Sequence, residues 1–206
     1  MSRGTLTAGM ASMLQKLSEL FSARRAPAGY RPGVTLEHLR RNLGLASFDQ
    51  TGPTAAQVSL DVDGLQVEIV ERTESQLLMH LVMTEFVIRV PASRAGMATF
   101  ELHHTGAVRR TGIRCRQRVG DTALLAELQA RLQADGALYQ ALMPLDFKRL
   151  RIGLQGQQWC VRLEHMGGSE VINRMPAFRR YIALSGEQRN SLFDTLAGFQ
   201  RILRNL

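Results

Sequence analysis

The segment of this sequence best suited to chemistry is an arginine-rich run, RRTGIRCRQR, at residues 109–118. Alternate side chains of an extended strand share a face, so Ile113, Cys115 and Val119 are expected to face the core. The opposite face would then carry four guanidinium groups, which bind phosphate and carboxylate in bidentate fashion; these belong to Arg110, Arg114, Arg116 and Arg118. The run therefore suggests a binding strip for phosphates or for an acidic protein. The alternative is a solvated face paired with the carboxylates of the 58–69 segment, Asp61 and Glu68.

A second candidate for anion binding lies at residues 167–180, which follow neither a helical nor a strand period. Its entry, Gly167, Gly168 and Ser169, could present backbone N–H groups to an anion. Three further cationic side chains lie close by in sequence, and these are Arg174, Arg179 and Arg180. The alternative is that the two glycines form an ordinary turn before a short helix. The segment matches neither a Walker loop nor a dinucleotide fingerprint.

No residue pattern predicts a catalytic centre, a metal or a cofactor. His103 and His104 are adjacent on an expected strand and so point to opposite faces, although Glu101 and His103 share one side. Cys115 and Cys160 lie between apolar neighbours, where buried and inert thiols are typical. An enzyme could still assemble its site from distant residues, so catalysis is disfavoured but left open.

Composition and charge limit the classes of partner that this chain is expected to bind. The 206 residues carry a formal net charge of +8, and residues 106–206 alone contribute sixteen basic and eight acidic side chains. Lys16 and Lys148 are the only lysines, so arginine chemistry dominates. Nucleic acid is disfavoured because aromatic residues make up only 6% of the chain and leave few stacking platforms. The sequence contains no run of about 20 apolar residues that would span a membrane, and two isolated cysteines favour the cytoplasm.

Two parts of the chain are expected. Residues 8–24 form an amphipathic helix by their apolar spacing, and residues 25–34 are a linker rich in Pro and Gly, so 1–34 is an N-terminal extension. This helix is free to dock on the body, on a partner or on a membrane; its acidic Glu19 and few basic residues favour the body. Residues 35–206 form a single domain, which opens with a helix from Thr35 to Gly44.

Two hairpins fix the fold class. In the first, Asp63 and Gly64 form a two-residue turn, which pairs Val62 with Leu65, Leu60 with Val67 and Val58 with Ile69. In the second, a turn at Gly156 and Gln157 pairs Leu154 with Trp159, Ile152 with Val161 and Leu150 with Leu163. Both registers collect the apolar side chains on one face.

Further strands and helices complete the pattern. Residues 73–90 are a short helix or strand followed by a strand, 85–90 pair with 97–104, and a strand covers 108–119. Asp121 caps one helix, and Ser185 with Gln188 forms a capping box for the last. The sequence thus predicts an α+β domain with a curved antiparallel sheet and helices packed on one face, built as two β-then-α halves.

The segment WCVRLEHMGGSEVINRMPAFRRYI resembles a family of uncharacterised bacterial proteins of unknown function, mainly over the C-terminal third. The resemblance implies a bacterial, cytoplasmic protein and supplies no activity. From the residues we expect a non-catalytic binding or regulatory protein that contacts an anionic partner. The alternative is an enzyme or carrier for an anionic or amphipathic small molecule held between sheet and helices. The oligomeric state is left open.

Overall fold

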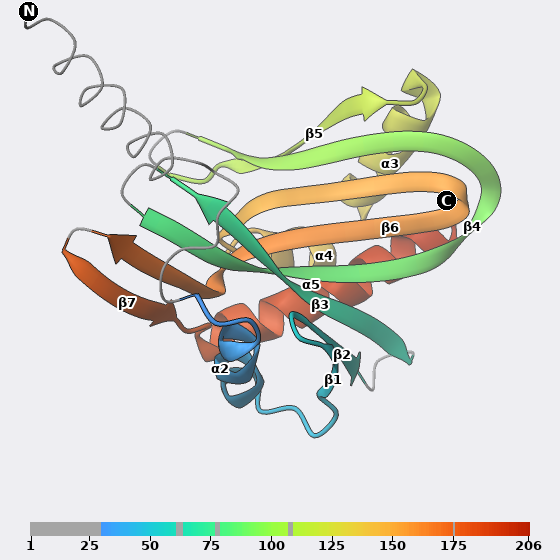
Figure 1. Ribbon diagram of the computed structural model, residues 1–206. Helices are drawn as coiled ribbons and strands as arrows, with labels where there is room; N and C mark the ends of the chain where they lie inside the picture. Colours follow the sequence, from blue (N-terminus) through green and yellow to red (C-terminus); the bar gives the residue numbers. More distant parts are fainter. Residues whose placement is uncertain (1–29, 61–63, 77–78, 107–108, 175) are drawn as a thin grey trace, which may run out of the picture.

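The computed structural model describes residues 30–60, 64–76, 79–106, 109–174 and 176–206. These residues form an α+β domain with one curled antiparallel sheet of seven strands and four helices (Figure 1). The helix expected at residues 8–24 lies outside the described residues. In chain order the elements are α2 (Val34–Leu43), β1 (Asp49–Gly52), β2 (Ala55–Leu60), β3 (Leu65–Ser75), β4 (Met79–Thr105), β5 (Gly112–Val119), α3 (Thr122–Ala134), α4 (Gly136–Leu142), β6 (Phe147–Arg174), β7 (Ala177–Ile182) and α5 (Gly186–Arg204).

Two long, bent strands, β4 and β6, form the middle of the sheet. The strand order is β1-β2-β3-β4-β6-β7, and β5 pairs with the far arm of β4. β6 bends near Gly156, whose φ of 60° is accessible to glycine. Just before β6 begins, Asp146 O accepts a hydrogen bond from Met166 N of the second arm at 3.0 Å. In Figure 1 both arms of β6 lie within the bend of β4, which follows them on the outside.

This arrangement corrects one predicted pairing and supports another. Residues 85–90 and 97–104 do not pair with each other, because each arm of β4 pairs with β6 instead. The fold-back of β6 occurs at the predicted turn. All six apolar residues expected to face the core from this hairpin are buried: Leu150, Ile152, Leu154, Trp159, Val161 and Leu163. The β-then-α order expected for the two halves is present, with β1–β5 before α3 and α4, and β6–β7 before α5.

The first hairpin has the predicted face but a different register. Leu60 pairs with Leu65 and Val58 with Val67, so the register is shifted by two residues from the prediction. The connection between β2 and β3 is therefore two residues longer than a two-residue turn, and Val62 lies outside the described residues. An even shift keeps every side chain on its face. Val58, Leu60 and Val67 accordingly all lie in the core.

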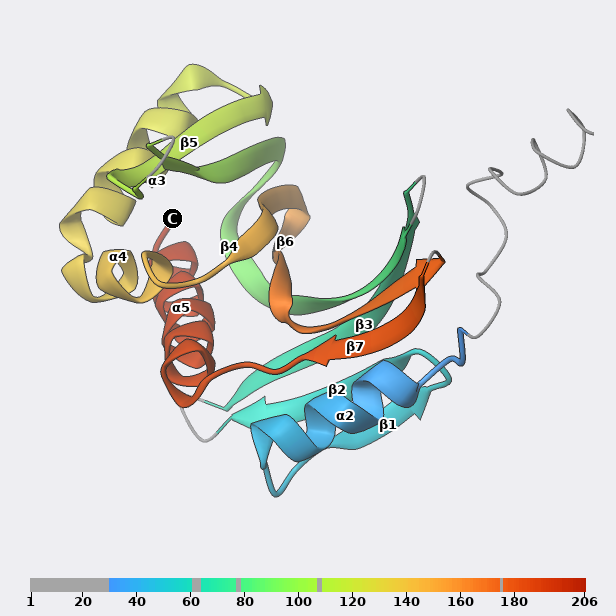
Figure 2. The same ribbon diagram turned by 90° about the vertical axis from the view of Figure 1, so that its left-hand side faces the viewer.

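The four helices contribute to a single apolar core on one face of the sheet (Figure 2). Leu39 of α2, Leu128 of α3, Leu138 of α4 and Phe199 of α5 are buried in the same cluster as Trp159 of β6. The helix termini follow local sequence signals. Asp121 accepts from Leu124 N, Ser185 and Gln188 form the expected capping box, and Gly44 ends α2 in the left-handed region.

Two ambiguous segments form strands. Residues 73–90, for which a helix was an option, belong to β3 and β4. The irregular segment 167–180 is an extended hairpin of β6 and β7, so the predicted loop and short helix are wrong. The expected start of α2 also moves by two residues, because its N-cap is Gly33 rather than the expected Thr35, which lies inside the helix. Within the described residues, we find no helix with the length and apolarity needed to cross a membrane.

Candidate functional site

The sheet face opposite the helices is strongly charged, and we call it the charged face. Strand alternation places it: Phe86 and Ile88 of β4 are buried in the core, so Glu85 and Arg89 point the other way. β5 and β6 alternate in the same manner. The charged face comprises Glu68, Arg72 and Glu74 of β3, Glu85, Arg89, Glu101 and His103 of β4, Arg114, Arg116 and Arg118 of β5, and Lys148, Arg149, Arg151, Arg162 and Glu164 of β6.

The carboxylates of the charged face each hold one or more cations. Glu101, whose side chain is 13% exposed, binds Arg118 at 2.7 Å and Arg151 at 2.8 Å. Glu85, 8% exposed, binds Arg162 at 2.9 Å and Arg72 at 3.1 Å. Because each carboxylate is shared between two strands, these ion pairs fix the positions of the guanidinium groups.

Two of these carboxylates have depressed pKa values. The hydrogen bond from Arg118, followed by that from Arg151, lowers the pKa of Glu101 against an opposing effect of burial. The hydrogen bond from Lys148 lowers the pKa of Glu74 in the same way. Both groups therefore remain ionised near neutral pH. The arginines bound to them have a carboxylate partner under all physiological conditions.

The charged face is hollowed in two adjoining places. A hollow of about 540 Å³ lies over β3, β4 and β6 and is lined by Arg72, Thr73, Glu74, Met83, Glu85, Arg149, Arg151, Arg162 and Glu164. A smaller one of about 280 Å³ is lined by Glu101, His103, Arg118, Lys148, Arg149, Leu150 and Arg151. Arg149 and Arg151 line both. The two hollows thus form one depression across the centre of the sheet.

The predicted arginine strip is only partly assembled. Arg114, Arg116 and Arg118 are exposed on one face of β5, as expected, whereas Arg110 precedes the strand and binds Asp146 and the carbonyl of Met143. Val119, expected in the core, is 47% exposed. The β4–β5 register shift accounts for this difference: Phe100 pairs with Gln117 and Thr99 with Val119, so the extra residue Arg118 breaks the alternation before Val119.

Of the two carboxylates predicted as partners of the strip, Glu68 is wrong. Glu68 binds Arg89 of β4 rather than a residue of β5, and Asp61 lies outside the described residues. The strip instead contacts Glu101 of the neighbouring strand, through Arg118 alone. Within the described part of the chain, Arg114 and Arg116 have no carboxylate partner. Neither expectation, a free strip or a fully paired one, describes this face.

The glycine-rich candidate at 167–169 is a structural bulge. Gly168 has φ 84°, and the β4–β6 register shifts here. Ser169 is 1% exposed; its hydroxyl donates to His165 O at 2.7 Å and accepts from Thr84 N at 3.3 Å. The Ser169 hydroxyl is therefore committed to the protein itself, and Gly167 and Gly168 beside it are buried.

The arginines of the second candidate are separated by the hairpin. Arg179 binds Glu170, which is 2% exposed and also accepts from Thr35 Oγ1 at 3.1 Å. Arg180 is exposed on the opposite face of β7, and the side chain of Arg174 is outside what the structure describes. Arg179 and Arg180 therefore do not converge on one site.

Sequence reasoning did not single out the arginines of β6 as site residues. Arg149, Arg151 and Arg162 line the larger hollow, whereas the predicted site residues lie at 110–118 and 167–180. Their signal was present in the second hairpin, where arginines alternate with the apolar residues that were assigned to the core. Reading the polar half of that alternation would have found them.

One histidine of β6, His165, is buried and bonds to backbone groups. His165 is fully buried, its Nδ1 lies 3.1 Å from Gly167 O, and its Nε2 accepts from Asp146 N at 3.0 Å. Burial is the main cause that lowers the pKa of His165. The ring is therefore neutral and structural.

Among the described residues no group of three His, Cys, Asp or Glu could hold a metal ion. Burial raises the pKa of the Cys115 thiol to about 11.

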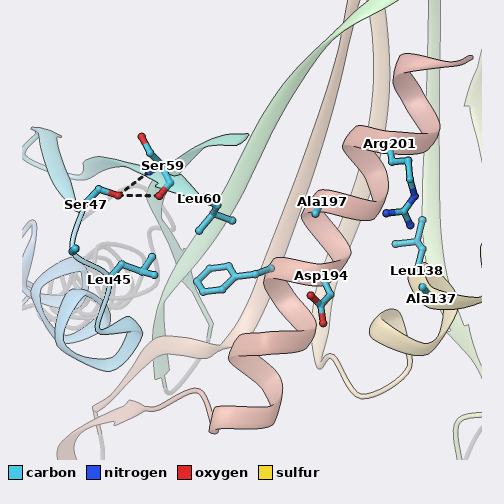
Figure 3. A pocket seen from close by; sticks show the side chains of 11 residues that line it. Leu45, Ser47, Ser59, Leu60, Ala137, Leu138, Asp194, Ala197 and Arg201 are labelled. Carbon is cyan, nitrogen blue, oxygen red and sulfur yellow. Dashed lines mark hydrogen bonds between the residues drawn. The ribbon is translucent and has the colours of Figure 1, made fainter. Parts of the chain in front are cut away.

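An apolar groove lies away from the charged face, between the chain after α2, the end of β2, and helices α4 and α5 (Figure 3). Its volume is about 570 Å³, and Leu45, Leu60, Leu138, Phe193 and Ala197 form its apolar lining. Asp194 and Arg201 are its charged residues. Figure 3 shows Leu45 and Leu60 on one side of Ala197 and Leu138 on the other.

No curated protein and no solved structure matches this chain. Residues 41–203 match a family described as a protein of unknown function, DUF3156. The match extends well beyond the C-terminal third in which the resemblance was noted, from within α2 to within α5. With this coverage, the chain belongs to the DUF3156 family of proteins of unknown function.

Proposed function

We propose that this chain is a non-catalytic binding protein whose charged face holds an acidic segment of another protein. One observation carries the proposal, namely the charge excess on that face. The two hollows are lined by six basic and four acidic side chains. Arg114 and Arg116 of the adjoining strand raise this to eight against four, an excess of four positive charges. This is half of the net charge of the chain, +8.

The ion pairs of the face favour binding because they fix guanidinium groups in advance. A flexible arginine loses about 0.5–1.5 kcal/mol of side-chain entropy when a partner immobilises it. Arg118 and Arg151 are already held by Glu101, and Arg72 and Arg162 by Glu85. A carboxylate that approaches these groups meets a positioned donor. Arg114 and Arg116 form no ion pair within the described chain, although Glu101 lies opposite Arg116 in the sheet, and they add further positive charge.

An acidic protein fits this face better than a nucleic acid does. Single-stranded nucleic acids are held by stacking on aromatic rings as well as by cations. No Phe, Tyr or Trp is among the residues that line the two hollows. Carboxylates require only the guanidinium groups that are present. We therefore assign the charged face to Asp- and Glu-rich protein segments.

Binding of a fluorescein-labelled Glu-rich 12-residue peptide to the full chain, followed by fluorescence anisotropy, tests the proposal. The R114E/R116E double variant removes the two unpaired guanidinium groups and should weaken binding at least about tenfold, since it reverses charge at the rim. The matched control is R31E/R204E, which changes the net charge equally at exposed arginines elsewhere. This control should change the Kd less than about threefold.

Three results decide between the classes of partner. Binding that weakens from 50 to 300 mM NaCl and depends on Arg114 and Arg116 supports the proposal. Equal losses in both double variants would reduce the effect to net charge and refute the site. A tighter complex with single-stranded DNA of the same charge, equally sensitive to R114E/R116E, would reassign the face to nucleic acid.

A carrier or enzyme for a small anion is the second candidate. The larger hollow, about 540 Å³, lies within the size range of small-molecule sites, and Arg149, Arg151 and Arg162 line it. Displacement of the labelled peptide by citrate at micromolar concentration would favour this candidate. Displacement only at concentrations that act through ionic strength would exclude it.

A further inference from the structure

The shape of the apolar groove suits the packing of another helix. Ala197 lies at its centre on α5, with Phe193 four residues before it and Arg201 four residues after it. A small side chain between two large ones leaves a notch into which the ridge of another helix can pack. Leu45 and Leu60 form one wall and Leu138 forms the other. Figure 3 shows Ala197 on the helix between these walls.

The groove has charges of both signs at its rim. Asp194 and Arg201 are exposed on α5, seven residues apart and therefore on one side of the helix. Arg201 is held in place by Asp135 at the start of α4, with Nε 3.1 Å from Oδ2. Apolar anchors in the middle and opposite charges along the edge are the features by which a groove recognises an amphipathic helix.

We propose that residues 8–24 of this same chain occupy the groove. Their apolar stripe consists of Met10, Met13, Leu14, Leu17, Leu20 and Phe21. Lys16 and Glu19 flank the stripe and complement Asp194 and Arg201. The groove has an apolar lining with charges of both signs beside it, and the sequence of the segment has an apolar stripe with charges of both signs beside it. The sequence of the segment alone could not identify this partner surface.

The groove lies within reach of the segment. The described chain begins at Tyr30, whose hydroxyl donates to Glu71 at 2.9 Å near the start of α2. Leu45 follows α2 directly, so the groove lies about 15 Å away along that ten-residue helix. The six residue steps from Arg24 to Tyr30 can span about 20 Å. Docking within one molecule is therefore possible without any change in the described fold.

Limited digestion of the full chain with endoproteinase Lys-C tests the proposal, because the chain has only two lysines, Lys16 and Lys148. Lys16 lies in the segment, and Lys148 lies in β6, where it binds Glu74. Cleavage at Lys16 therefore reports release of the segment, and cleavage at Lys148 reports unfolding. A197R fills the notch, and L20D places a charge in the apolar stripe away from the scissile bond. Each should accelerate cleavage at Lys16 about tenfold or more and leave Lys148 protected.

The matched control is A130R, the same substitution at an exposed position of α3 outside the groove. It should leave both rates unchanged.

Cleavage at Lys16 that is equally fast in the unmodified chain, in the groove variant and in the segment variant would overturn the proposal. Protection that fades on dilution would place the segment on a second copy, and protection that appears only with anionic vesicles would place it on a membrane. Either result would also overturn docking within one molecule. None of these rates depends on Arg114 or Arg116, so this proposal and the one for the charged face can fail separately.

Discussion

Replacement of Glu71 by alanine should release the start of α2 from the sheet. Glu71 belongs to β3, is 6% exposed, and accepts three hydrogen bonds: from Tyr30 Oη at 2.9 Å, Gly33 N at 3.1 Å and Leu36 N at 3.1 Å. The N-cap of α2 is Gly33, which has no side chain that could satisfy the first N–H groups. A carboxylate from the sheet therefore takes the place of the usual capping residue and joins helix to sheet.

The expected loss of unfolding free energy in E71A follows from the groups that lose their hydrogen-bond acceptor. Loss of a helix cap costs about 1 kcal/mol. The buried N–H of Leu36 is then left without a partner, at about 1–2 kcal/mol, and the hydroxyl of Tyr30 loses a bond to a charged group, at about 1 kcal/mol after partial solvation. The E71A variant should therefore lose about 3 kcal/mol of unfolding free energy. Glu71→Gln, which keeps one acceptor oxygen but not the charge, should lose about half as much.

Urea unfolding followed by far-UV circular dichroism measures the loss, with E68A as the matched control. Glu68 lies three residues away on the same strand, but its carboxylate makes a surface ion pair with Arg89, so its removal should cost less than about 1 kcal/mol. Hydrogen exchange should show faster opening of α2 in E71A and no change in α5. An E71A loss equal to that of E68A would refute the capping role. A double-mutant cycle with Y30F should give a coupling of about 1 kcal/mol.

Two further predictions concern stability. Burial lowers the pKa of His165, so below about pH 6.5 the unfolded chain binds a proton that the folded chain does not, and the free energy of unfolding should fall as the pH drops through that range. His165→Gln should flatten this slope between pH 7.5 and 5 in urea titrations, and an unchanged slope would contradict the assignment. Gly198 of α5 packs against Leu138, whose Cδ1 would lie 2.9 Å from an added Cβ, so G198A should lower Tm despite the better helix propensity of alanine, at a net cost of about 1 kcal/mol. Gly186→Ala, which meets nothing within 4 Å, should leave Tm unchanged or raise it, and the reasoning fails if the two variants behave alike.

Features set by neighbouring residues could be predicted from the sequence. The caps at Asp121, Ser185 and Gly44 depend on hydrogen bonds within one helical turn, and all three are present. The apolar faces of both hairpins were also predicted, because side-chain alternation is insensitive to an even shift in register. These local rules were sufficient for the α+β fold class.

Features set by distant segments could not be predicted. Residues 85–90 and 97–104 were expected to pair because they are close in sequence, yet the distant strand β6 pairs with both segments. The segment 167–180 lacks a strand period because buried polar groups, Ser169 and Glu170, interrupt it. The carboxylate that meets the arginine strip is Glu101 rather than Glu68, and that choice depends on strand order. Hydrophobic periodicity contains no information on strand order.

Some arginines of the charged face form ion pairs with carboxylates and others do not. This difference affects which partner the charged face suits. An anion that enters the larger hollow meets guanidinium groups positioned by Glu85 and Glu164, but it must share them with these carboxylates. An anion that approaches Arg114 and Arg116 meets no such competitor in the described chain. These two residues are separated by two strand positions, which corresponds to about 7 Å along β5. Carboxylates at alternate positions of an extended peptide have the same spacing. An acidic segment lying along β5 can therefore bind both groups without breaking an existing ion pair, whereas a single small anion can reach only one of them at a time.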